Sequence, residues 1–496
     1  MSAMRGQACV HTSTLVGTEA VPVEVQVDVG SGLPAFTIVG LGDSAVLEAR
    51  ERVRTAIRSN GFKFPNARVL VNLAPGPLRK HGTGFDLPIA CAILVATGQV
   101  CSSRIEGARV VGELALDGTV RSVPGILAHA LGARRDTLDL LSAADTADVM
   151  ESLGGLVYRP LADLRSIANG VHRSSAPVAT PISTFCIPDM AEVAGHALAK
   201  RALEIAAAGG HNLLFTGPPG SGKTMLARRL PGILPALDEE ERCASALVHS
   251  VAGLDARPVL GGIRPFRAPH HSASVAGLVG GGSPPRPGEV SLAHNGVLFL
   301  DELPEFGPAA LQTLRQPMED GHITLVRADG RIQLPARFSL VAAANPCPCG
   351  HYGDPGRDCK CTEAMVARYQ NRVGGPLMDR IDMLVDIERI EPDLIVKMPE
   401  GESSATIAKR VCAARERSAS HSSDRSASLA GTQLLKSCGM DEATTDLVSA
   451  LARLHRMSGR GVTRLLRVAR TIADLEGAAT VATAHVVEAA SYRRQE

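Results

Sequence analysis

An eight-residue phosphate-binding motif constrains the chain more than any other feature of its sequence. The motif GPPGSGKT follows the apolar run LLF and precedes a segment with helical spacing. Its glycines let backbone N–H groups turn inward around phosphate oxygens, its lysine adds a cation, and its threonine hydroxyl ligates Mg²⁺. A strand, this loop and a helix in that order predict a P-loop nucleotide site in a doubly wound, parallel α/β sheet. The residues expected to bind the nucleotide are Gly217, Pro218, Pro219, Gly220, Ser221, Gly222, Lys223 and Thr224.

Two further apolar runs end in polar residues that suit ATP hydrolysis. Asp301 and Glu302 follow the run GVLFL, and a strand there would place them at the carboxyl end of the sheet, where ligands bind. We expect Asp301 to hold Mg²⁺ through water together with Thr224, and Glu302 to polarise the attacking water as general base. The run RFSLVAAA leads to Asn345, whose amide either contacts the water or the γ-phosphate, or caps a turn before Pro346. ATP and Mg²⁺ are therefore the expected cofactors.

The length of 496 residues exceeds one ordinary core and predicts two or three domains. Val-rich runs near the N-terminus alternate with a helical pattern at residues 44–59, which predicts an α/β domain. A stretch rich in Ser, Thr, Ala and Pro then predicts a linker, and a helix is expected at residues 192–208, before the strand that leads to the P-loop. Near the C-terminus, residues 441–457 and 463–476 have amphipathic helical spacing. The predicted parts are an α/β domain at 1–165, a linker at 166–188, an ATPase core at 189–398 and a helical lid at 399–496.

The net charge does not indicate a nucleic-acid partner or exclude one, because 52 Lys and Arg residues nearly match 51 Asp and Glu residues. The first residues lack the apolar core of a secretory signal. The longest apolar stretch, residues 87–97, is too short to span a bilayer. We therefore expect a cytoplasmic protein with no membrane partner.

Four of the 11 cysteines cluster as two Cys-x-Cys pairs. Four thiolates can close a tetrahedral Zn²⁺ site, although this spacing is tighter than the usual Cys-x₂₋₄-Cys knuckle. Free thiols, a redox pair and an iron–sulfur cluster are the alternatives. Soft ligands gathered in a reducing compartment favour a structural zinc that braces the loop after Asn345. The four expected ligands are Cys347, Cys349, Cys359 and Cys361.

Two segments, which precede the second and the third apolar runs, could contact a polyanion. Residues 319–337 contain two alternating runs that flank Ala-Asp-Gly, which predicts a β-hairpin. Residues 255–295 carry several basic side chains among glycines and prolines. Basic loops suit the phosphates of DNA, and the alternative is an ordinary exposed loop with solvated charges. The basic residues of that second segment are Arg264, Arg267, His270, His271 and Arg286.

These motifs together resemble the AAA+ ATPases of the magnesium-chelatase-like group, and within it the YifB/ComM branch. The segments GVLFLDELPEF, AAANPCPCG, GGPLMDRIDMLVDI and SGRGVTRLLRVARTIADLEG carry the resemblance, as does RAPHHSASVAGLVGGGSPPRPGEVSLAHN. It extends from about residue 20 to about residue 490. The resemblance implies a homo-hexameric ring that binds ATP between subunits, with residues 319–337 and 255–295 facing the pore, where DNA would be bound.

The resemblance also implies roles for single residues. Asn345 resembles the sensor 1 residue. Arg380, in MDRID, resembles the arginine finger that reaches the γ-phosphate of a neighbouring subunit. An arginine supplied in this way stabilises transition-state charge and contributes about 10³–10⁵ in rate. Arg460, in SGRG, resembles sensor 2, and Arg464 is the near alternative. A surface ion pair of little energetic value is the alternative for each arginine.

Residues 20–165 resemble the Lon-protease-like fold, which belongs to the ribosomal S5 domain 2-like folds. Active members use a serine nucleophile and a lysine. Gly84 takes the place of that serine in the segment Lys80–Asp86, and the lysine position falls near Leu127. Thr83 is adjacent to the serine position but shifted by one residue. Because covalent catalysis needs an activated hydroxyl, we expect no peptidase activity.

The function implied by the resemblance is an ATP-driven, hexameric DNA translocase or helicase. It would move along single-stranded or branched DNA and drive branch migration in recombination or natural transformation, with recombination proteins as further partners. A magnesium-chelatase-type motor subunit, an ATP-dependent protease and a protein-remodelling ATPase are the alternatives. The missing serine and lysine argue against the protease, and the fused N-terminal domain and cysteine loop favour the DNA branch.

Overall fold

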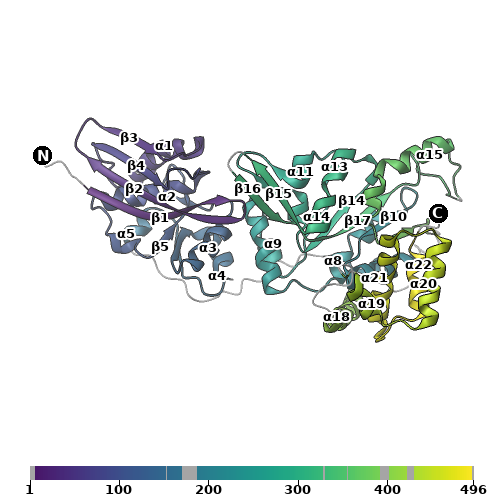
Figure 1. Ribbon diagram of the computed structural model, residues 1–496. Helices are drawn as coiled ribbons and strands as arrows, with labels where there is room; N and C mark the ends of the chain where they lie inside the picture. The colour runs from purple at the N-terminus through teal and green to yellow at the C-terminus, as the bar shows by residue number, and fades with distance from the viewer. Residues whose placement is uncertain are drawn as a thin grey trace.

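Figure 1 shows an N-terminal α/β part, a central sheet with its helices, and a C-terminal group of helices that packs beside the central sheet. The predicted linker at residues 166–188 begins inside helix α5 (Arg165–Asn169), and residues 170–186 lie outside the described part of the chain. The computed structural model describes residues 6–151, 153–169, 187–327, 330–354, 356–390, 401–421, 429 and 431–493.

The N-terminal part is built on a mixed seven-stranded sheet with the strand order β3-β4-β2-β1-β5-β8-β9. Strands β1 (Gly6–Val16) and β2 (Glu19–Gly30) form a long antiparallel hairpin at its centre. The alternation in β2 turns its valines toward the core, where Val25 is fully buried. The remaining strands are β3 (Ala35–Val39), β4 (Arg68–Ala74), β5 (Ala108–Val110), β6 (Glu113–Leu114), β7 (Val120–Arg121), β8 (Asp139–Ala143) and β9 (Tyr158–Leu161).

The helices of this part cover the sheet. Helix α1 (Ser44–Ser59) has the predicted span, and Asp43 caps it by accepting a hydrogen bond of 2.9 Å from the Val46 N–H. Every residue of α2 (Asp86–Ala96) from Asp86 to Leu94 is buried, in agreement with its apolar sequence. The other helices are α3 (Ile126–Arg135), α4 (Ala147–Glu151) and α5.

The central sheet has five parallel strands in the order β11-β14-β17-β10-β18. The first of these strands in the chain, β10, lies between β17 and the edge strand β18, so the P-loop emerges at the carboxyl edge beside the end of β17. The structure confirms the predicted α/β class with a parallel sheet. The strands are β10 (Leu213–Thr216), β11 (Phe266–Arg267), β14 (Gly296–Leu300), β17 (Phe338–Ala344) and β18 (Met383–Asp386).

The predicted hairpin is confirmed. Strands β15 (His322–Arg327) and β16 (Gly330–Pro335) pair antiparallel, and Ala328 and Asp329 at the turn lie outside the described residues. Ile323 and Leu334 anchor the base of the hairpin in the core below the central sheet.

The helix expected from Glu192 to Ala208 begins later than predicted. The chain forms one 3₁₀ turn at Met190–Glu192, and α6 then spans Ala197–Gly209. Gly195 and His196 have φ angles of +60° and +52°, so the backbone cannot continue helically between them.

The other elements of the central part are short helices and one small strand pair. They are α7 (Lys223–Ala227), α8 (Leu230–Ile233), α9 (Glu239–Val251), α10 (Arg257–Leu260), α11 (Val275–Val279), β12 (Gly280–Gly281), β13 (Arg286–Pro287), α12 (Glu289–Leu292), α13 (Pro308–Thr313), α14 (Arg315–Asp320), α15 (Glu363–Gln370) and α16 (Gly375–Met378).

The C-terminal region is helical, as predicted. Its central helix, α21 (Gly459–Glu476), buries Leu465, Ala469 and Ile472 in a core shared with α6 and the central sheet. The other helices are α18 (Ser404–His421), α19 (Gly431–Cys438), α20 (Glu442–Leu454) and α22 (Thr483–Ser491). None of the described helices is long and apolar enough to cross a membrane.

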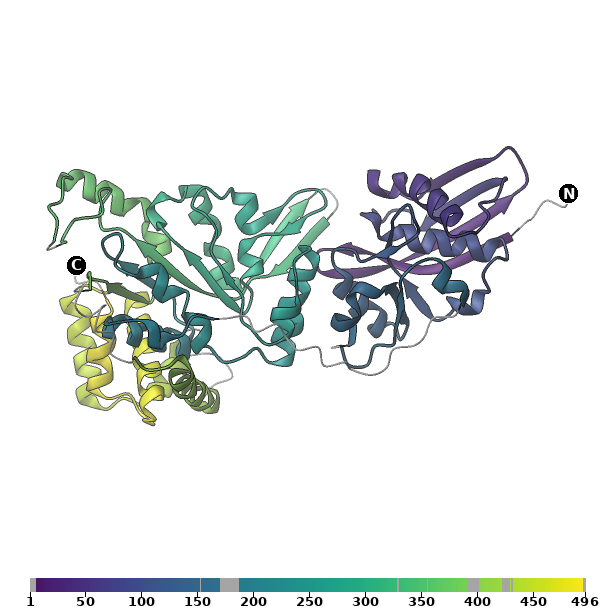
Figure 2. The same cartoon turned by 180° about the vertical axis from the view of Figure 1, so that it is seen from behind.

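The N-terminal part docks on helix α9, as Figure 2 shows from behind. Leu127 of α3 and Ala246 of α9 belong to one buried apolar cluster. The backbone of the two parts is also joined, because the Gly125 N–H donates to the Ser250 carbonyl at 2.7 Å and the Leu127 N–H donates to Ser250 Oγ at 3.2 Å.

Candidate nucleotide site

The P-loop runs from the end of β10 into α7, and close packing explains one of its glycines while backbone conformation explains another. A methyl group on Gly217 would lie 2.2 Å from the Ile387 carbonyl oxygen, so no larger residue fits there. Gly222, which precedes the first residue of α7, has a φ angle of +90°, which disfavours other residues. The Gly217 N–H donates to the Ala344 carbonyl at 3.2 Å and ties the loop to the end of β17.

Lys223 is buried and donates to the carbonyls of Gly217 at 2.6 Å and Pro218 at 2.8 Å. Its Nζ also lies 3.3 Å from Asn345 Oδ1. Burial lowers the pKa of Lys223 to about 8, although the charges of Asp301 and Glu302 oppose that shift. The ammonium group is thus held inside the loop, where phosphate oxygens can replace the carbonyls as acceptors.

Thr224 and Asp301 meet across the site in a way that suits Mg²⁺. The Thr224 hydroxyl, from α7, donates to Asp301 Oδ2 at 2.6 Å. The other carboxylate oxygen of Asp301 accepts a hydrogen bond of 2.9 Å from the Glu302 N–H. Hard oxygen ligands beside phosphates are the set that Mg²⁺ prefers, so the two predicted residues fit this ion.

Glu302 follows Asp301 with a left-handed φ angle of +52°. Its side chain is half exposed, and Oε2 lies 3.1 Å from Nδ1 of His271. The ring of His270 packs on that of His271 with 4.1 Å between centroids. The sequence pattern grouped His271 with the basic residues of the 255–295 segment, and only the folded path of that segment brings it to Glu302.

Asn345 lies at the carboxyl end of β17, next to Lys223. It also lines a cavity of about 520 Å³ between the central sheet and the C-terminal helices, together with Thr216, Asp379, Arg464 and Tyr492. The asparagine that the sequence associates with nucleotide sensing therefore faces both the P-loop and the helical region.

Among the described residues of its own chain, the partners of Arg380 lie outside the P-loop. Its guanidinium donates to the Pro376 carbonyl at 2.6 Å and pairs with Glu319 at the end of α14. Its Nε is buried without a hydrogen-bond partner.

Arg460 and Arg464 lie in different environments on helix α21. Arg460 is exposed in the first turn. Arg464 is buried and donates to the carbonyls of Ile381 at 2.8 Å and Met378 at 3.2 Å. Arg464 thus lines the cavity beside Asn345, whereas Arg460 does not, and the choice of sensor 2 remains a prediction.

The basic residues of the 255–295 segment divide into two groups. Arg264 is buried and donates to Glu241 at 2.7 Å and to the Asn295 carbonyl at 2.7 Å. Arg267 forms two hydrogen bonds of 2.7 Å with Glu289. These two arginines stabilise the fold of the segment, while His270 and Arg286 are exposed to solvent.

The four clustered cysteines converge on one point. The Sγ atoms of Cys347, Cys349 and Cys359 lie 3.4 to 3.7 Å from one another, and all four ligand atoms, including Cys361 Sγ, lie within 4.8 Å of one another. Backbone N–H groups of His351 and Lys360 lower the pKa of Cys349 to about 6, which favours its thiolate. This donor set fits a soft, tetrahedral metal ion.

The position that corresponds to the peptidase serine, Gly84, lies in an apolar environment. A side-chain carbon on Gly84 would lie 3.5 Å from Val111 and 3.7 Å from Val123, both apolar. The neighbouring Thr83 hydroxyl donates a hydrogen bond to the Glu113 carboxylate. Leu127 is fully buried at the contact with α9.

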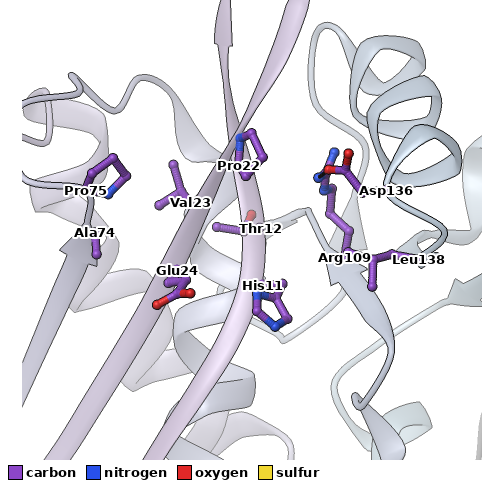
Figure 3. Close-up of a pocket in the computed structure, with 10 residues that line it drawn as sticks. All are labelled: His11, Thr12, Pro22, Val23, Glu24, Ala74, Pro75, Arg109, Asp136 and Leu138. Carbon is purple, nitrogen blue, oxygen red and sulfur yellow. Dashed lines mark hydrogen bonds and ion pairs between the residues drawn. The ribbon is translucent and has the colours of Figure 1, made fainter.

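A second cavity, of about 400 Å³, lies in the N-terminal part between strands β1, β2 and β4 and the end of α3 (Figure 3). It is lined in part by His11, Glu24 and an ion pair between Arg109 and Asp136. The sequence patterns predicted no site there.

The five-stranded parallel sheet, the P-loop, the Thr224–Asp301 contact and the attached helices define a P-loop ATPase of the AAA+ class. Family models match three stretches of the chain: "Subunit ChlI of Mg-chelatase" at residues 25–144, "Magnesium chelatase, subunit ChlI" at 189–395, and "Magnesium chelatase, subunit ChlI C-terminal" at 401–493. These matches extend over the N-terminal sheet, the central sheet and the C-terminal helices.

Among curated proteins, YifB of Salmonella typhimurium is 45% identical over 493 residues, which cover 98% of this chain and 97% of that protein. Competence protein ComM of Haemophilus influenzae is 40% identical over 98% of this chain and 97% of its own length. The Holliday junction branch migration complex subunit RuvB of Neorickettsia sennetsu is 31% identical over 153 residues, which are 30% of this chain and 35% of that protein. The chain belongs to the YifB/ComM family of magnesium-chelatase-like proteins.

Proposed function

We propose that this protein is an ATP-driven, hexameric DNA translocase or helicase that promotes branch migration in recombination or natural transformation. The names of two relatives support the DNA substrate, since one is a competence protein and the other a subunit of a branch migration complex. Single-stranded or branched DNA and recombination proteins are the partners that this activity requires.

The contact between Glu302 and His271 carries the proposal. It joins the proposed general base to a segment that also exposes His270 and Arg286. On the other side of the site, the hairpin β15–β16 leads directly into β17, whose end carries Asn345. DNA bound by these two segments would therefore act on residues that face the nucleotide.

The chemistry assigned to the site is phosphoryl transfer to water. Lys223 binds the phosphates of ATP, and Thr224 and Asp301 orient Mg²⁺, which supplies positive charge to the phosphate oxygens when it is bound. Glu302 accepts the proton of the attacking water. Arg380 of a neighbouring subunit would leave its ion pair with Glu319 and bind the γ-phosphate, where its charge stabilises the transition state.

The four-cysteine cluster is proposed to hold a structural zinc ion. Its thiolates would brace the loop that follows Asn345, and no step of hydrolysis passes through the metal. Equimolar zinc in the purified protein, without iron, is the expected metal content.

The proposal is tested by measuring ATP hydrolysis with and without single-stranded and forked DNA. We expect DNA to raise kcat severalfold, Lys223→Ala to abolish hydrolysis, and Glu302→Gln to lower kcat by about 10²–10⁴ while nucleotide binding is retained. DNA affinity should fall steeply as salt rises, because phosphate contacts release counterions. Hydrolysis without any DNA stimulation or DNA binding at low salt would contradict the translocase and leave the ATPase intact.

A magnesium-chelatase-type motor subunit is the second candidate, favoured by the three matching families, which are those of magnesium chelatase subunit ChlI. It predicts ATP hydrolysis that is indifferent to DNA. The same assay therefore separates the two candidates.

A further inference from the structure

The cysteine cluster lies close to the nucleotide site in both sequence and space. Cys347 is two residues beyond Asn345 and is fully buried. The residues between Cys347 and Cys361 form a loop between the end of β17 and the start of α15. We refer to residues 347–361 as the cysteine loop.

The cysteine loop touches the P-loop at one residue. Gly350 has a φ angle of +82°, and a methyl group placed on it would lie 2.7 Å from Cδ and 3.2 Å from Cγ of Pro219. The backbone of Gly350 therefore packs directly on the proline ring in the phosphate-binding motif. A shift of the loop by even a fraction of an ångström would therefore change how Gly350 packs against the phosphate-binding motif.

Contacts that do not involve the cysteines position the middle of the loop and the residue that precedes it. The buried carboxylate of Asp354 lies 3.2 Å from His351 and 3.3 Å from Arg389, which follows β18. Gln370 of α15 donates to the Pro346 carbonyl at 3.0 Å. These contacts hold the outer part of the loop, whereas Gly350 lies between the cysteine ligands.

Little regular structure supports the part of the loop that carries Gly350. Among its described residues, the loop contains neither helix nor strand, and the Gly350 N–H is bonded to the Cys347 carbonyl at 3.0 Å within the same turn. Four thiol groups within 4.8 Å of one another form at best weak hydrogen bonds. Metal binding would supply the missing restraint, because the binding free energy of a structural zinc acts as folding free energy.

We propose that zinc bound by Cys347, Cys349, Cys359 and Cys361 holds Gly350 against Pro219 and thereby sets the affinity of the P-loop for nucleotide. The proposal rests on the proposed function only in that the P-loop binds nucleotide. The metal thus controls nucleotide occupancy, in addition to stabilising a local loop.

The first test compares zinc-loaded protein with protein stripped by a chelator that is then removed. The affinity for ADP is measured by calorimetry in Mg²⁺ buffer, and readdition of Zn²⁺ alone should restore it. We expect the Kd to rise about tenfold on stripping, which corresponds to about 1.4 kcal/mol. Cys359→Ser should reproduce the loss, whereas Cys101→Ser, at an exposed cysteine of the N-terminal part, should not.

The second test leaves all four ligands intact. Gly350→Ala places a methyl group against Pro219, and Gly353→Ala is its matched control, because Gly353 has a φ angle of +76° and no atom within 4 Å of the added carbon. Both variants carry similar backbone strain, so a specific effect must come from the contact. We expect Gly350→Ala to keep its zinc and lose affinity for ADP, and Gly353→Ala to bind as the wild type does.

Unchanged ADP affinity in stripped protein, or equal affinities for the two glycine variants, would overturn the proposal. Iron in place of zinc would overturn the identity of the metal. Neither readout involves DNA, so a protein that fails to respond to DNA still tests this inference. Thermal unfolding of each variant distinguishes a local change at the P-loop from loss of the fold.

Discussion

The contact between Glu302 and His271 joins two residues of the nucleotide site that lie far apart in the sequence. The P-loop residues could be predicted because their order along the chain is itself the binding geometry. Asp301 and Glu302 could be predicted because they directly follow an apolar strand. The neighbour of Glu302 could not, since His271 reaches it only through the fold of a segment rich in glycine and proline, whose path has no simple periodicity.

His271→Ala tests whether this neighbour restrains the proposed general base. A carboxylate oxygen that lies against His271 is less available to a water molecule. A half-exposed contact of this kind is worth about 0.5–1 kcal/mol. We therefore expect ATP hydrolysis without DNA to rise about two- to fivefold, and the stimulation by DNA to shrink. His270→Ala is the matched control, and equal basal rates for the two variants would exclude the restraint.

For single helices and strands, the boundaries that could be predicted were those marked by capping residues or by a clear apolar pattern. Helix α1 could be predicted in full because Asp43 caps it and its apolar residues share one face. The start of α6 was predicted too early, because the sequence pattern does not show that His196 adopts a positive φ angle. Strand β1 was not predicted, since its polar residues hide the alternation, and its pairing with β2 defines it.

The hairpin β15–β16 combines a buried base with an exposed end. Val326 is 75% exposed, and Arg331 is exposed on the opposite strand. If the hairpin binds the DNA backbone, Arg331→Ala should weaken binding for all sequences and reduce the salt slope by about 1. Basal hydrolysis should stay unchanged. Arg58→Ala, at an exposed arginine of α1, is the control. Equal DNA affinities for the two variants would show that Arg331 of the hairpin does not bind the DNA backbone.

At the scale of the whole molecule, the position of the N-terminal part follows from its contact with α9. The sequence predicted a separate α/β domain but could not predict how it docks. The docking surface combines apolar residues from α3 and α9, and each set alone is ordinary core sequence. The two parts consequently share buried surface, which favours joint unfolding.

Ser250→Ala tests the energy of this contact. The variant removes the acceptor of the buried Leu127 N–H, and an unsatisfied buried donor costs about 1–3 kcal/mol. We expect the midpoint of urea unfolding of the N-terminal part to fall and its transition to separate from that of the ATPase core. Ser103→Ala, at an exposed position, should leave the profile as in the wild type. A single unshifted transition for Ser250→Ala would show that the apolar cluster alone holds the parts together.

The turn between β1 and β2 reaches the hairpin on the central sheet, where a methyl group on Gly17 would lie 2.6 Å from the side chain of Ile332. A rigid strand pair that starts at this contact extends through the N-terminal sheet. The N-terminal sheet therefore contacts the hairpin directly through Gly17 and Ile332. If the hairpin moves during ATP hydrolysis, as the proposed translocase requires, a fluorescent label on the far side of the N-terminal sheet would report that movement without altering the hairpin itself.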